Sequence, residues 1–189
     1  MRCCVPERSR FMKGILFRVI EDVVFEALSA DAWDDVIDRS GVSGSYTSLG
    51  NYPDNDLAKI ISALAAVANM SEDDTLRLSG RAGFKHFVRR APQALEGLDD
   101  WKVVMTSLDD IIHPEVLKSS PDAAVPSFVV VPDGAALIVT YMSERGLCIL
   151  AEGLILGCGD WFDVGLSVEH LTCIHKDGES CTMRVAEAG

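Results

Sequence analysis

Residues 126–145 read PSFVVVPDGAALIVTYMSER, and here the sequence changes from the spacing of helices to the short apolar runs of strands. Two apolar runs, Phe128 to Val131 and Ala136 to Met142, flank the turn residues Pro132-Asp133-Gly134. Short runs rich in valine and isoleucine on either side of such a turn predict two antiparallel strands. We therefore expect a β-hairpin here, and the flanking segments indicate what packs against it.

The segments before this hairpin have the spacing of amphipathic helices. From Ile15 to Val24 the apolar residues recur every three or four positions, and later segments repeat the pattern. This period predicts helices over residues 15–24, 31–39 and 57–64. Residues 43–55 contain two glycines and a proline, and we predict that they form a loop.

A fourth helix is predicted to begin at Ser71, which resembles a capping box together with Asp74 three residues later. The helix should continue to about Arg89. We expect an interruption near Gly80 and Gly83, because glycine is a poor helix former.

A further helical stripe extends from Asp99 to Ser119 and contains His113-Pro114. Proline removes one backbone hydrogen bond from the interior of a helix and clashes with the preceding turn. The sequence therefore predicts a kink or break at His113-Pro114.

After the hairpin, residues 145–162 return to helical spacing, and residues 166–175 and 181–185 are two predicted strands about the turn 176–179. Helices followed by antiparallel strands with one helix between them predict an α+β fold. We expect one domain over residues 12–185, preceded by a leader of residues 1–11 and followed by a tail of residues 186–189.

The charge of the chain limits its partners. The 17 basic and 29 acidic residues give a net charge of -12. A protein with this charge is repelled by the phosphates of nucleic acids and by anionic lipids. We therefore expect neither nucleic acid nor membrane as a partner. The chain has no long apolar run and no apolar stretch of the kind that a secretory signal needs, so we expect a cytoplasmic protein.

Tyr141, Ser143 and Arg145 are the most informative polar residues of the chain. If the strand remains extended, their side chains alternate and point to one side. Two hydroxyl groups and a guanidinium suit a pair of carboxylates, because arginine stays charged and can bind a carboxylate through two nitrogens. A surface salt bridge from Arg145 is the alternative explanation.

His113 lies upstream on an otherwise apolar stripe, and Pro126-Ser127-Phe128 precedes Tyr-x-Ser-x-Arg. Together with Met12-Lys13-Gly14 and Tyr52-Pro53-Asp54, this order resembles the H-NOX family of haem nitric-oxide and oxygen binding domains from about Met12 to Val185. The resemblance implies a haem b cofactor with His113 as proximal iron ligand. It also implies that Tyr141, Ser143 and Arg145 bind the propionates and that Pro126 presses on the porphyrin.

The resemblance also bears on the gas. Oxygen-binding members of the family have a distal tyrosine nine residues after the propionate tyrosine, and the matching residue here is Leu150. An apolar distal pocket favours NO and CO over O₂, because bound O₂ benefits from a hydrogen-bond donor. By similar offsets the pocket would be lined by Leu16, Ile20, Gly83, Phe87, Leu150 and Leu154. Each of these could also be an ordinary core residue.

We therefore expect a sensor of NO that excludes O₂ and signals to a separate protein. No catalytic triad, phosphate-binding loop or pair of acids is evident, so catalysis is not expected. In bacterial relatives of the family the partner is commonly a histidine kinase or a cyclic-di-nucleotide enzyme.

A second set of residues suggests a metal. Three thiols and an imidazole suit a closed tetrahedral zinc site, and the chain has such a set in Cys148, His170, Cys173 and Cys181. A similar site occurs in a subset of H-NOX domains. A strand places residues three apart on opposite faces, so a bulge near Leu171 would be needed. Separate buried thiols are the alternative.

Other histidines and cysteines remain without a firm role. His175 is a competing imidazole, Cys158 has no assigned function, and Cys3 and Cys4 fall in the leader. Zinc-bound thiolates can be oxidised with loss of the metal, so the site could also act as a thiol redox sensor.

Two other classes of protein compete with the sensor. A zinc-containing small-molecule-binding domain without haem, which resembles the vinyl-reductase-type ligand-binding domains, would explain the cysteines but not His113 together with Tyr141, Ser143 and Arg145. A haem peroxidase would need a polar distal acid-base residue, and the predicted pocket offers none, although the sequence does not place His86.

Overall fold

The computed structural model describes residues 11–119, 121, 123–176, 178 and 180–188. The predicted leader therefore lies outside the described residues except for Phe11, and so do Cys3 and Cys4. The α+β fold is confirmed, with helices in the first part of the chain and an antiparallel sheet in the second. Four helices open the fold: α1 Gly14–Ala27, α2 Ala30–Ser40, α3 Asp54–Ala68 and α4 Glu72–Arg90.

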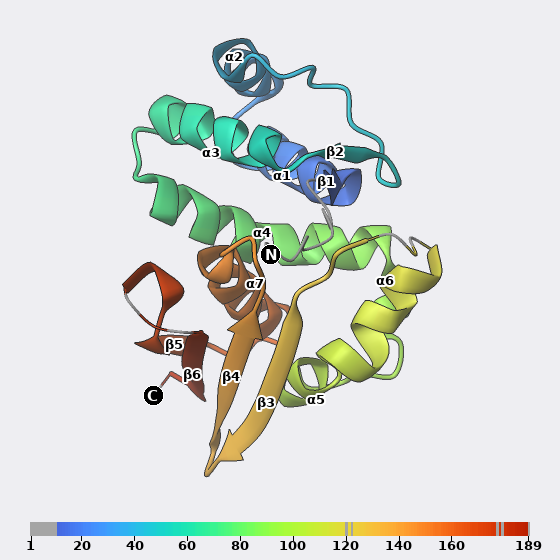
Figure 1. Ribbon diagram of the computed structural model, residues 1–189, viewed down its shortest axis with the longest axis vertical. Coiled ribbons are helices and arrows are strands. Elements are labelled where there is room, and N and C mark those ends of the chain that lie inside the picture. Colours follow the sequence, from blue (N-terminus) through green and yellow to red (C-terminus); the bar gives the residue numbers. More distant parts are fainter. Residues whose placement is uncertain (1–10, 120, 122, 177, 179, 189) are drawn as a thin grey trace, which may run out of the picture.

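The first three helices share a core of their own and lie together on one side of α4 (Figure 1). Phe17, Trp33 and Ile60 are among its buried side chains. The predicted loop 43–55 ends in a short strand, β2 Asn51–Pro53, which pairs antiparallel with β1 Phe11–Lys13. Strands of three residues are too short to show an alternating pattern, which is why the sequence did not predict them.

The middle of the chain is divided into short segments. They are a 3₁₀ turn η1 at Pro92–Leu95, α5 at Trp101–Thr106, a π-helical turn η2 at Leu108–Ile112 and α6 at His113–Ser119. The predicted break at His113-Pro114 therefore falls one residue earlier, where η2 ends. Pro114 occupies the first turn of α6, where a missing backbone N–H costs little.

The sheet has the strand order β3-β4-β6-β5, and neighbouring strands are antiparallel. The predicted hairpin is confirmed as β3 Ser127–Asp133 and β4 Ala136–Met142, joined by the two residues Gly134 and Ala135. The chain then forms α7 Cys148–Trp161, β5 Leu166–Thr172, a 3₁₀ turn η3 at Ile174–Lys176, and β6 Cys181–Glu187. The turn predicted at 176–179 falls in part on residues 177 and 179, which lie outside the described residues.

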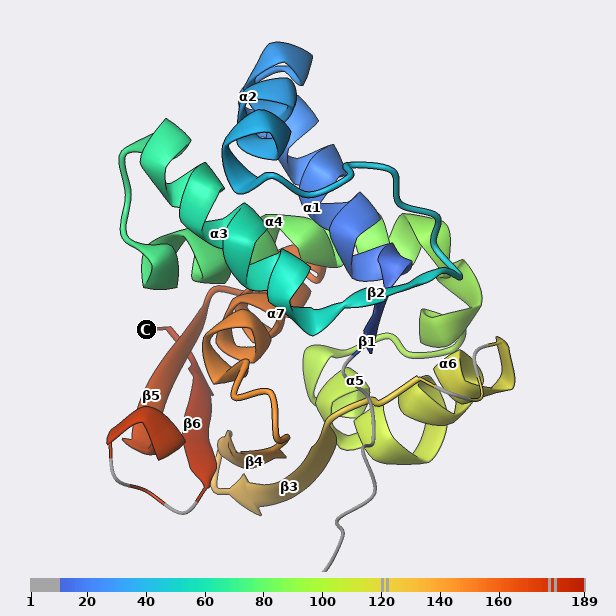
Figure 2. The same ribbon diagram turned by 45° about the horizontal axis from the view of Figure 1, so that its top comes forward.

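Helix α7 lies between the sheet and α4 (Figures 1 and 2). The predicted interruption of α4 near Gly80 and Gly83 is wrong, because the helix is continuous from Glu72 to Arg90. These glycines instead allow close packing. A Cβ atom at Gly80 would lie 2.6 Å from the carbonyl oxygen of Leu150, and one at Gly83 would lie 2.8 Å from Val19.

Two glycines of α7 allow the same close packing where α7 crosses α4. A Cβ atom at Gly153 would lie 2.1 Å from the carbonyl oxygen of Arg77, and one at Gly157 would lie 2.3 Å from that of Arg81. The two helix backbones are therefore in contact without side chains between them. Among the described residues, no helix is both long and apolar enough to cross a membrane.

Replacing Gly153 by alanine should separate α4 from α7. The new methyl group would overlap the backbone of Arg77, and overpacking of this kind costs about 1–3 kcal/mol. Gly165→Ala is the matched control, because the nearest atom to its Cβ would be 3.8 Å away. Urea denaturation of both variants measures the difference, and equal stability of the two would contradict the proposed contact.

Candidate functional site

His113 lies at the junction of η2 and α6, with its side chain 14% exposed. Its Nδ1 atom is 3.0 Å from Oδ1 of Asp109, one turn earlier. The other ring nitrogen, Nε2, has no hydrogen-bond partner among the described residues. A carboxylate beside Nδ1 favours the tautomer with the proton on that nitrogen. The lone pair is then on Nε2, the atom that could bind a metal ion.

Asp109 also ties the histidine to the sheet. Its Oδ2 atom accepts hydrogen bonds from the Ser127 hydroxyl at 2.7 Å and from the Phe128 backbone N–H at 2.8 Å. Burial would raise the pKa of Asp109, but these bonds and the one from His113 outweigh it and hold the pKa below its ordinary value. Burial lowers the pKa of His113, which favours the neutral imidazole that a metal requires.

Phe128 lies between His113 and Tyr141. The centroid of its ring is 5.7 Å from that of His113 and 5.4 Å from that of Tyr141. The structure therefore brings the candidate ligand and the first candidate propionate residue to either side of Phe128, near the start of β3 and the end of β4. Pro126 is half-buried directly before β3.

Tyr141, Ser143 and Arg145 converge, but not through an extended strand. Strand β4 ends at Met142, and the chain then turns so that the N–H of Gly146 donates to the carbonyl oxygen of Ser143. Gly146 has a φ of 64°, a value that favours glycine. The backbone N–H of Arg145 donates to the Ser143 hydroxyl at 3.3 Å, so the turn also fixes the side chain of Ser143.

The hydroxyl of Tyr141 is held within the same turn. It accepts a hydrogen bond from the N–H of Leu147 at 3.2 Å. Burial raises the pKa of Tyr141, although its hydrogen bond with Ser143 acts in the opposite direction. A buried neutral phenol of this kind is a donor that suits a carboxylate ligand.

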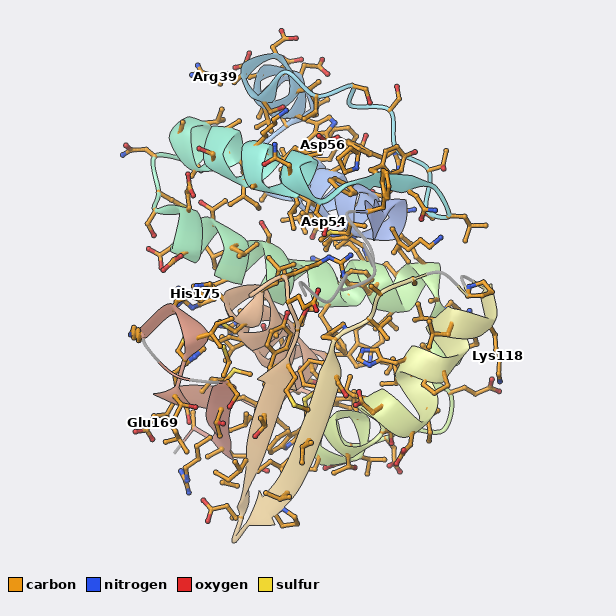
Figure 3. All side chains as sticks on the ribbon, in the orientation of Figure 1. Arg39, Asp54, Asp56, Lys118, Glu169 and His175 are labelled. Carbon is orange, nitrogen blue, oxygen red and sulfur yellow. The ribbon has the colours of Figure 1, made fainter. Side chains whose placement is uncertain are left out.

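Arg145 joins three separate parts of the chain. Its Nε donates to Asp54 at 2.9 Å, Nη2 to the carbonyl oxygen of Phe11 at 2.8 Å, and Nη1 to that of Ala124 at 2.7 Å. Asp54 begins α3 and lies on the side that faces α4 (Figure 3). The sequence contained Asp54 in its Tyr-Pro-Asp segment, but no local spacing linked it to an arginine 91 positions away.

The residues predicted to line the distal pocket come from three helices that pack on one another. Leu16 and Ile20 lie on α1, Gly83 and Phe87 on α4, and Leu150 and Leu154 on α7. Ile20 is 1% exposed and belongs to the core that α1 shares with α2 and α3. Leu150 is buried, whereas Leu16, Phe87 and Leu154 are half-buried.

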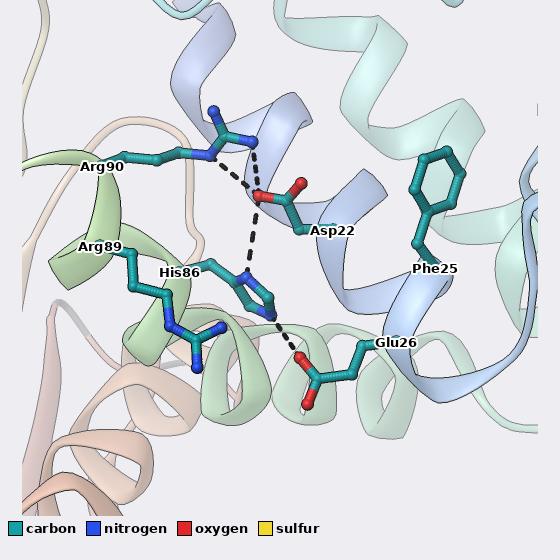
Figure 4. A pocket seen from close by; sticks show the side chains of 6 residues that line it. All are labelled: Asp22, Phe25, Glu26, His86, Arg89 and Arg90. Carbon is teal, nitrogen blue, oxygen red and sulfur yellow. Dashed lines mark hydrogen bonds and ion pairs between the residues drawn. The ribbon is translucent and has the colours of Figure 1, made fainter.

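His86 lies one turn after Gly83 on α4, and its imidazole faces carboxylates of α1. It lines a cavity of about 450 Å³ with Asp22, Phe25, Glu26, Arg89 and Arg90 (Figure 4). Its Nδ1 is 3.7 Å from Asp22 and its Nε2 is 3.1 Å from Glu26. Both nitrogens therefore face carboxylates, which argues against His86 as a distal acid-base group.

Three of the four predicted zinc ligands come together. The Sγ atoms of Cys148, Cys173 and Cys181 all lie within 4.8 Å of one another, with Cys173 at 3.7 Å from Cys148 and 3.9 Å from Cys181. Zinc–sulfur bonds of about 2.3 Å at tetrahedral angles separate the sulfurs by about 3.8 Å. The spacing therefore fits a zinc ion. Burial raises the pKa of the Cys148 thiol well above its ordinary value.

The structure does not place His170 with the sulfurs. The predicted bulge is present as a shift in register between His170 and Thr172. The imidazole turns toward α7, where Nε2 is 3.0 Å from Glu152, which in turn accepts from Arg77 at 2.7 Å. Buried glutamate needs such partners, and the sequence did not reveal that Glu152 was buried.

The remaining imidazole and thiol also lie outside the sulfur cluster. Nε2 of His175 is 2.7 Å from the carbonyl oxygen of Gly146. Cys158 is fully buried further along α7, and burial raises its pKa to about 12.

The model of a family described as haem-NO-binding matches residues 13–170. The soluble guanylate cyclase gcy-32 of Caenorhabditis elegans is 23% identical over 157 residues. The match covers 76% of this chain and 22% of that protein, so the chain spans about a fifth of its length.

Solved structures match over nearly the whole chain. An H-NOX protein from S. oneidensis in the Fe(II)NO ligation state has a TM-score of 0.87 and 26% identity, and covers 94% of this chain and 100% of its own. The Fe(II) unliganded H-NOX protein from K. algicida has a TM-score of 0.79 and 27% identity, and covers 94% and 97%.

Replacing Asp109 by asparagine should destabilise the chain at neutral pH. The charged acceptor of three hydrogen bonds is lost, which costs about 1–3 kcal/mol. Because the folded-state pKa of Asp109 lies below its ordinary value of 3.8, this contribution is present above that value and is lost as the pH falls through the folded-state pKa. Urea unfolding at steps from about pH 7 to about pH 3 measures the difference.

Asp110→Asn is the control, because Asp110 is the exposed neighbour and makes no hydrogen bond or ion pair in the described part of the chain. It should change the free energy of unfolding by less than about 0.5 kcal/mol. A difference between Asp109→Asn and the parent chain that stays constant down to the lowest pH would contradict the assigned bonds.

Proposed function

The chain belongs to the haem-NO-binding family, and on this basis we propose that it senses nitric oxide at a ferrous haem b, binds CO as well, and excludes O₂. Members of this family are haem-based gas sensors that signal to other proteins. The domain proper would extend over residues 12–185, act without catalysis, and pass its signal to a separate protein. A histidine kinase or a cyclic-di-nucleotide enzyme is the proposed class of partner.

One observation carries the proposal: Nε2 of His113 is available while Nδ1 is held by Asp109. A ligating histidine needs its second nitrogen oriented in this way. His113 would be the proximal ligand, and Tyr141, Ser143 and Arg145 would hold the propionates. Pro126, which directly precedes the strand held by Asp109, would contact the porphyrin. The short distance from His113 through Phe128 to Tyr141 supports placing both groups around one cofactor.

The preference for NO rests on the distal side. When bound, the haem iron supplies an open coordination position for a diatomic gas. The residues proposed to face it are Leu16, Ile20, Gly83, Phe87, Leu150 and Leu154, which offer no hydrogen-bond donor from their side chains. Of these, Ile20 has the weakest support, because it is buried in the N-terminal core.

His113 and Asp109 would also transmit the signal. In the family, NO weakens the bond to the proximal histidine. Once His113 is released from that restraint, α6 can shift relative to the sheet, and Asp109 would carry the movement to Ser127 and Phe128 on β3. The π-helical turn before His113 favours such a shift, since π-turns interrupt the regular helix and are common at functional sites.

A structural zinc site is a second proposal. It is supported by the three sulfur atoms at the spacing of a tetrahedral site, with Cys148, Cys173 and Cys181 as ligands. The fourth ligand would be His170. To bind the metal, its imidazole would have to break its contact with Glu152. Thiolates oxidise more readily than thiols, so the same site would make the β5–β6 hairpin sensitive to oxidants.

The first test is the absorption spectrum of the reduced, haem-loaded chain. We expect a Soret band that shifts with NO and with CO and does not change in air, because the distal side lacks a donor for O₂. His113→Ala should lose or alter the band. His175→Ala, which removes an imidazole bound to Gly146, should leave it unchanged. A parent-like NO response without His113 would refute the assigned ligand, and a shift in air would refute the exclusion of O₂.

The zinc proposal is tested by the metal content of the purified chain. We expect about one zinc per chain, and its loss on Cys173→Ser, because a site with two thiolates binds zinc far less tightly than one with three. Cys158→Ser is the control, since it removes a buried thiol of α7 outside the cluster. Unchanged zinc content in Cys173→Ser would contradict the site. Retention of zinc in His170→Ala would rule out His170 as the fourth ligand but would leave the three sulfur ligands in place.

A further inference from the structure

A second cavity lies between α3 and α4, next to the turn that carries Arg145. We call it the α3–α4 groove. Its volume is about 680 Å³, which is within the range of sites that bind ligands. It is lined by Met12, Pro53, Asp54, Asn55, Leu57, Ala58, Ile61, Glu72, Asp73, Leu76, Glu144, Arg145 and Leu147.

The floor of the groove is apolar. Leu57 and Ile61 of α3 and Met12 of β1 are buried there, and Leu76 and Leu147 are half-buried beside them. Leu147 packs against both the N-terminal core and the core under the sheet. A side chain that fills this cavity would therefore contact both halves of the molecule and bury apolar surface.

The rim of the groove is acidic. Glu72 and Asp73 in the first turn of α4, and Glu144 in the turn after β4, line the groove and are exposed. In the described part of the chain none of these three carboxylates makes a hydrogen bond or an ion pair. Together with the net charge of -12, they give the groove a field that attracts cations.

One end of the groove is the ion pair between Asp54 and Arg145. Arg145 is also the proposed propionate ligand. Any movement of the turn 143–146 therefore changes the shape and the charge of the groove. A ligand in the groove would contact the residues that position this arginine.

We propose that the α3–α4 groove is the docking site for a basic amphipathic segment of the partner protein. The apolar floor suits leucine-like anchors, and the three separate carboxylates suit lysines or arginines spaced along a chain. A second copy of this chain is a poor occupant, because its acidic surface would be repelled. Nucleic acid and anionic membranes are excluded by the same charge.

The test uses the full haem-loaded chain and two fluorescein-labelled peptides. Each peptide has about 14 residues with leucines at helical spacing, and the remaining positions are lysine in one and glutamate in the other. Fluorescence anisotropy should show binding of the lysine peptide only. Its affinity should fall about tenfold or more in Glu72→Gln/Asp73→Asn/Glu144→Gln, since three complementary charges are removed.

The control is Asp31→Asn/Asp34→Asn/Asp38→Asn, which removes three exposed charges from α2 and leaves the groove intact. It should change the affinity less than about twofold. Ala58→Trp, which fills the groove from its exposed edge, should abolish binding while the Soret band is retained. Equal loss of affinity in the two triple variants, or full binding to Ala58→Trp, would overturn the proposal.

Octylammonium is a third probe, and it tests whether the occupant of the groove is a protein segment or a small amphiphilic cation. If it binds as tightly as the lysine peptide, the groove is a site for a small amphiphilic cation and the proposed occupant is wrong. Weak binding of octylammonium supports the peptide segment, whose several charges act together.

The link between the groove and the gas rests on the proposed function. The lysine peptide should bind with different affinity to the Fe(II) chain and to the Fe(II)NO chain. Equal affinity would overturn the link through Arg145, while the shift of the Soret band reports independently whether haem and NO are bound. The groove and the haem proposal can therefore fail separately.

Discussion

The close crossing of α4 and α7 is the constraint on which both candidate sites depend. At Gly80, Gly153 and Gly157 the backbones of the two helices touch, so no side chain fits between them. This contact fixes α7 across α4, with the sheet on its other side (Figure 2). Arg145 lies in the turn before α7 and Cys148 begins the helix. One helix packing therefore positions both the proposed propionate site and the sulfur cluster.

Much of this arrangement could be predicted because it depends on local patterns. The apolar spacing of α1 to α4 reports which face each helix buries, and the hairpin of β3 and β4 follows from two apolar runs about a turn. The bulge between His170 and Thr172 was predicted because His170 and Cys173, three apart on a strand, would otherwise lie on opposite faces. Such features need only neighbouring residues to specify them.

The features that were missed depend on residues far apart in the chain. Taken alone, the glycines of α4 predicted a weak helix, but Gly80 is in fact needed for the close packing of α4 on α7. Asp54 pairs with Arg145 across 91 positions, and Glu152 holds His170 against α7. Asp109 was visible only as an acid on a helix, although its second oxygen binds the start of β3. A single sequence gives no spacing rule for contacts of this kind.

The hydrogen bond between Phe11 and Arg145 joins positions 134 residues apart. During synthesis the N-terminal helices leave the ribosome first and can collapse on their own core. The hydrogen bonds from Arg145 to Phe11 and Asp54, which connect this part of the chain to the turn after β4, form only after Arg145 has emerged. Capture of a cofactor at the proposed site would therefore be a late event in biogenesis, and a ribosome stalled before that point would carry a helical fragment without the proposed propionate ligand Arg145.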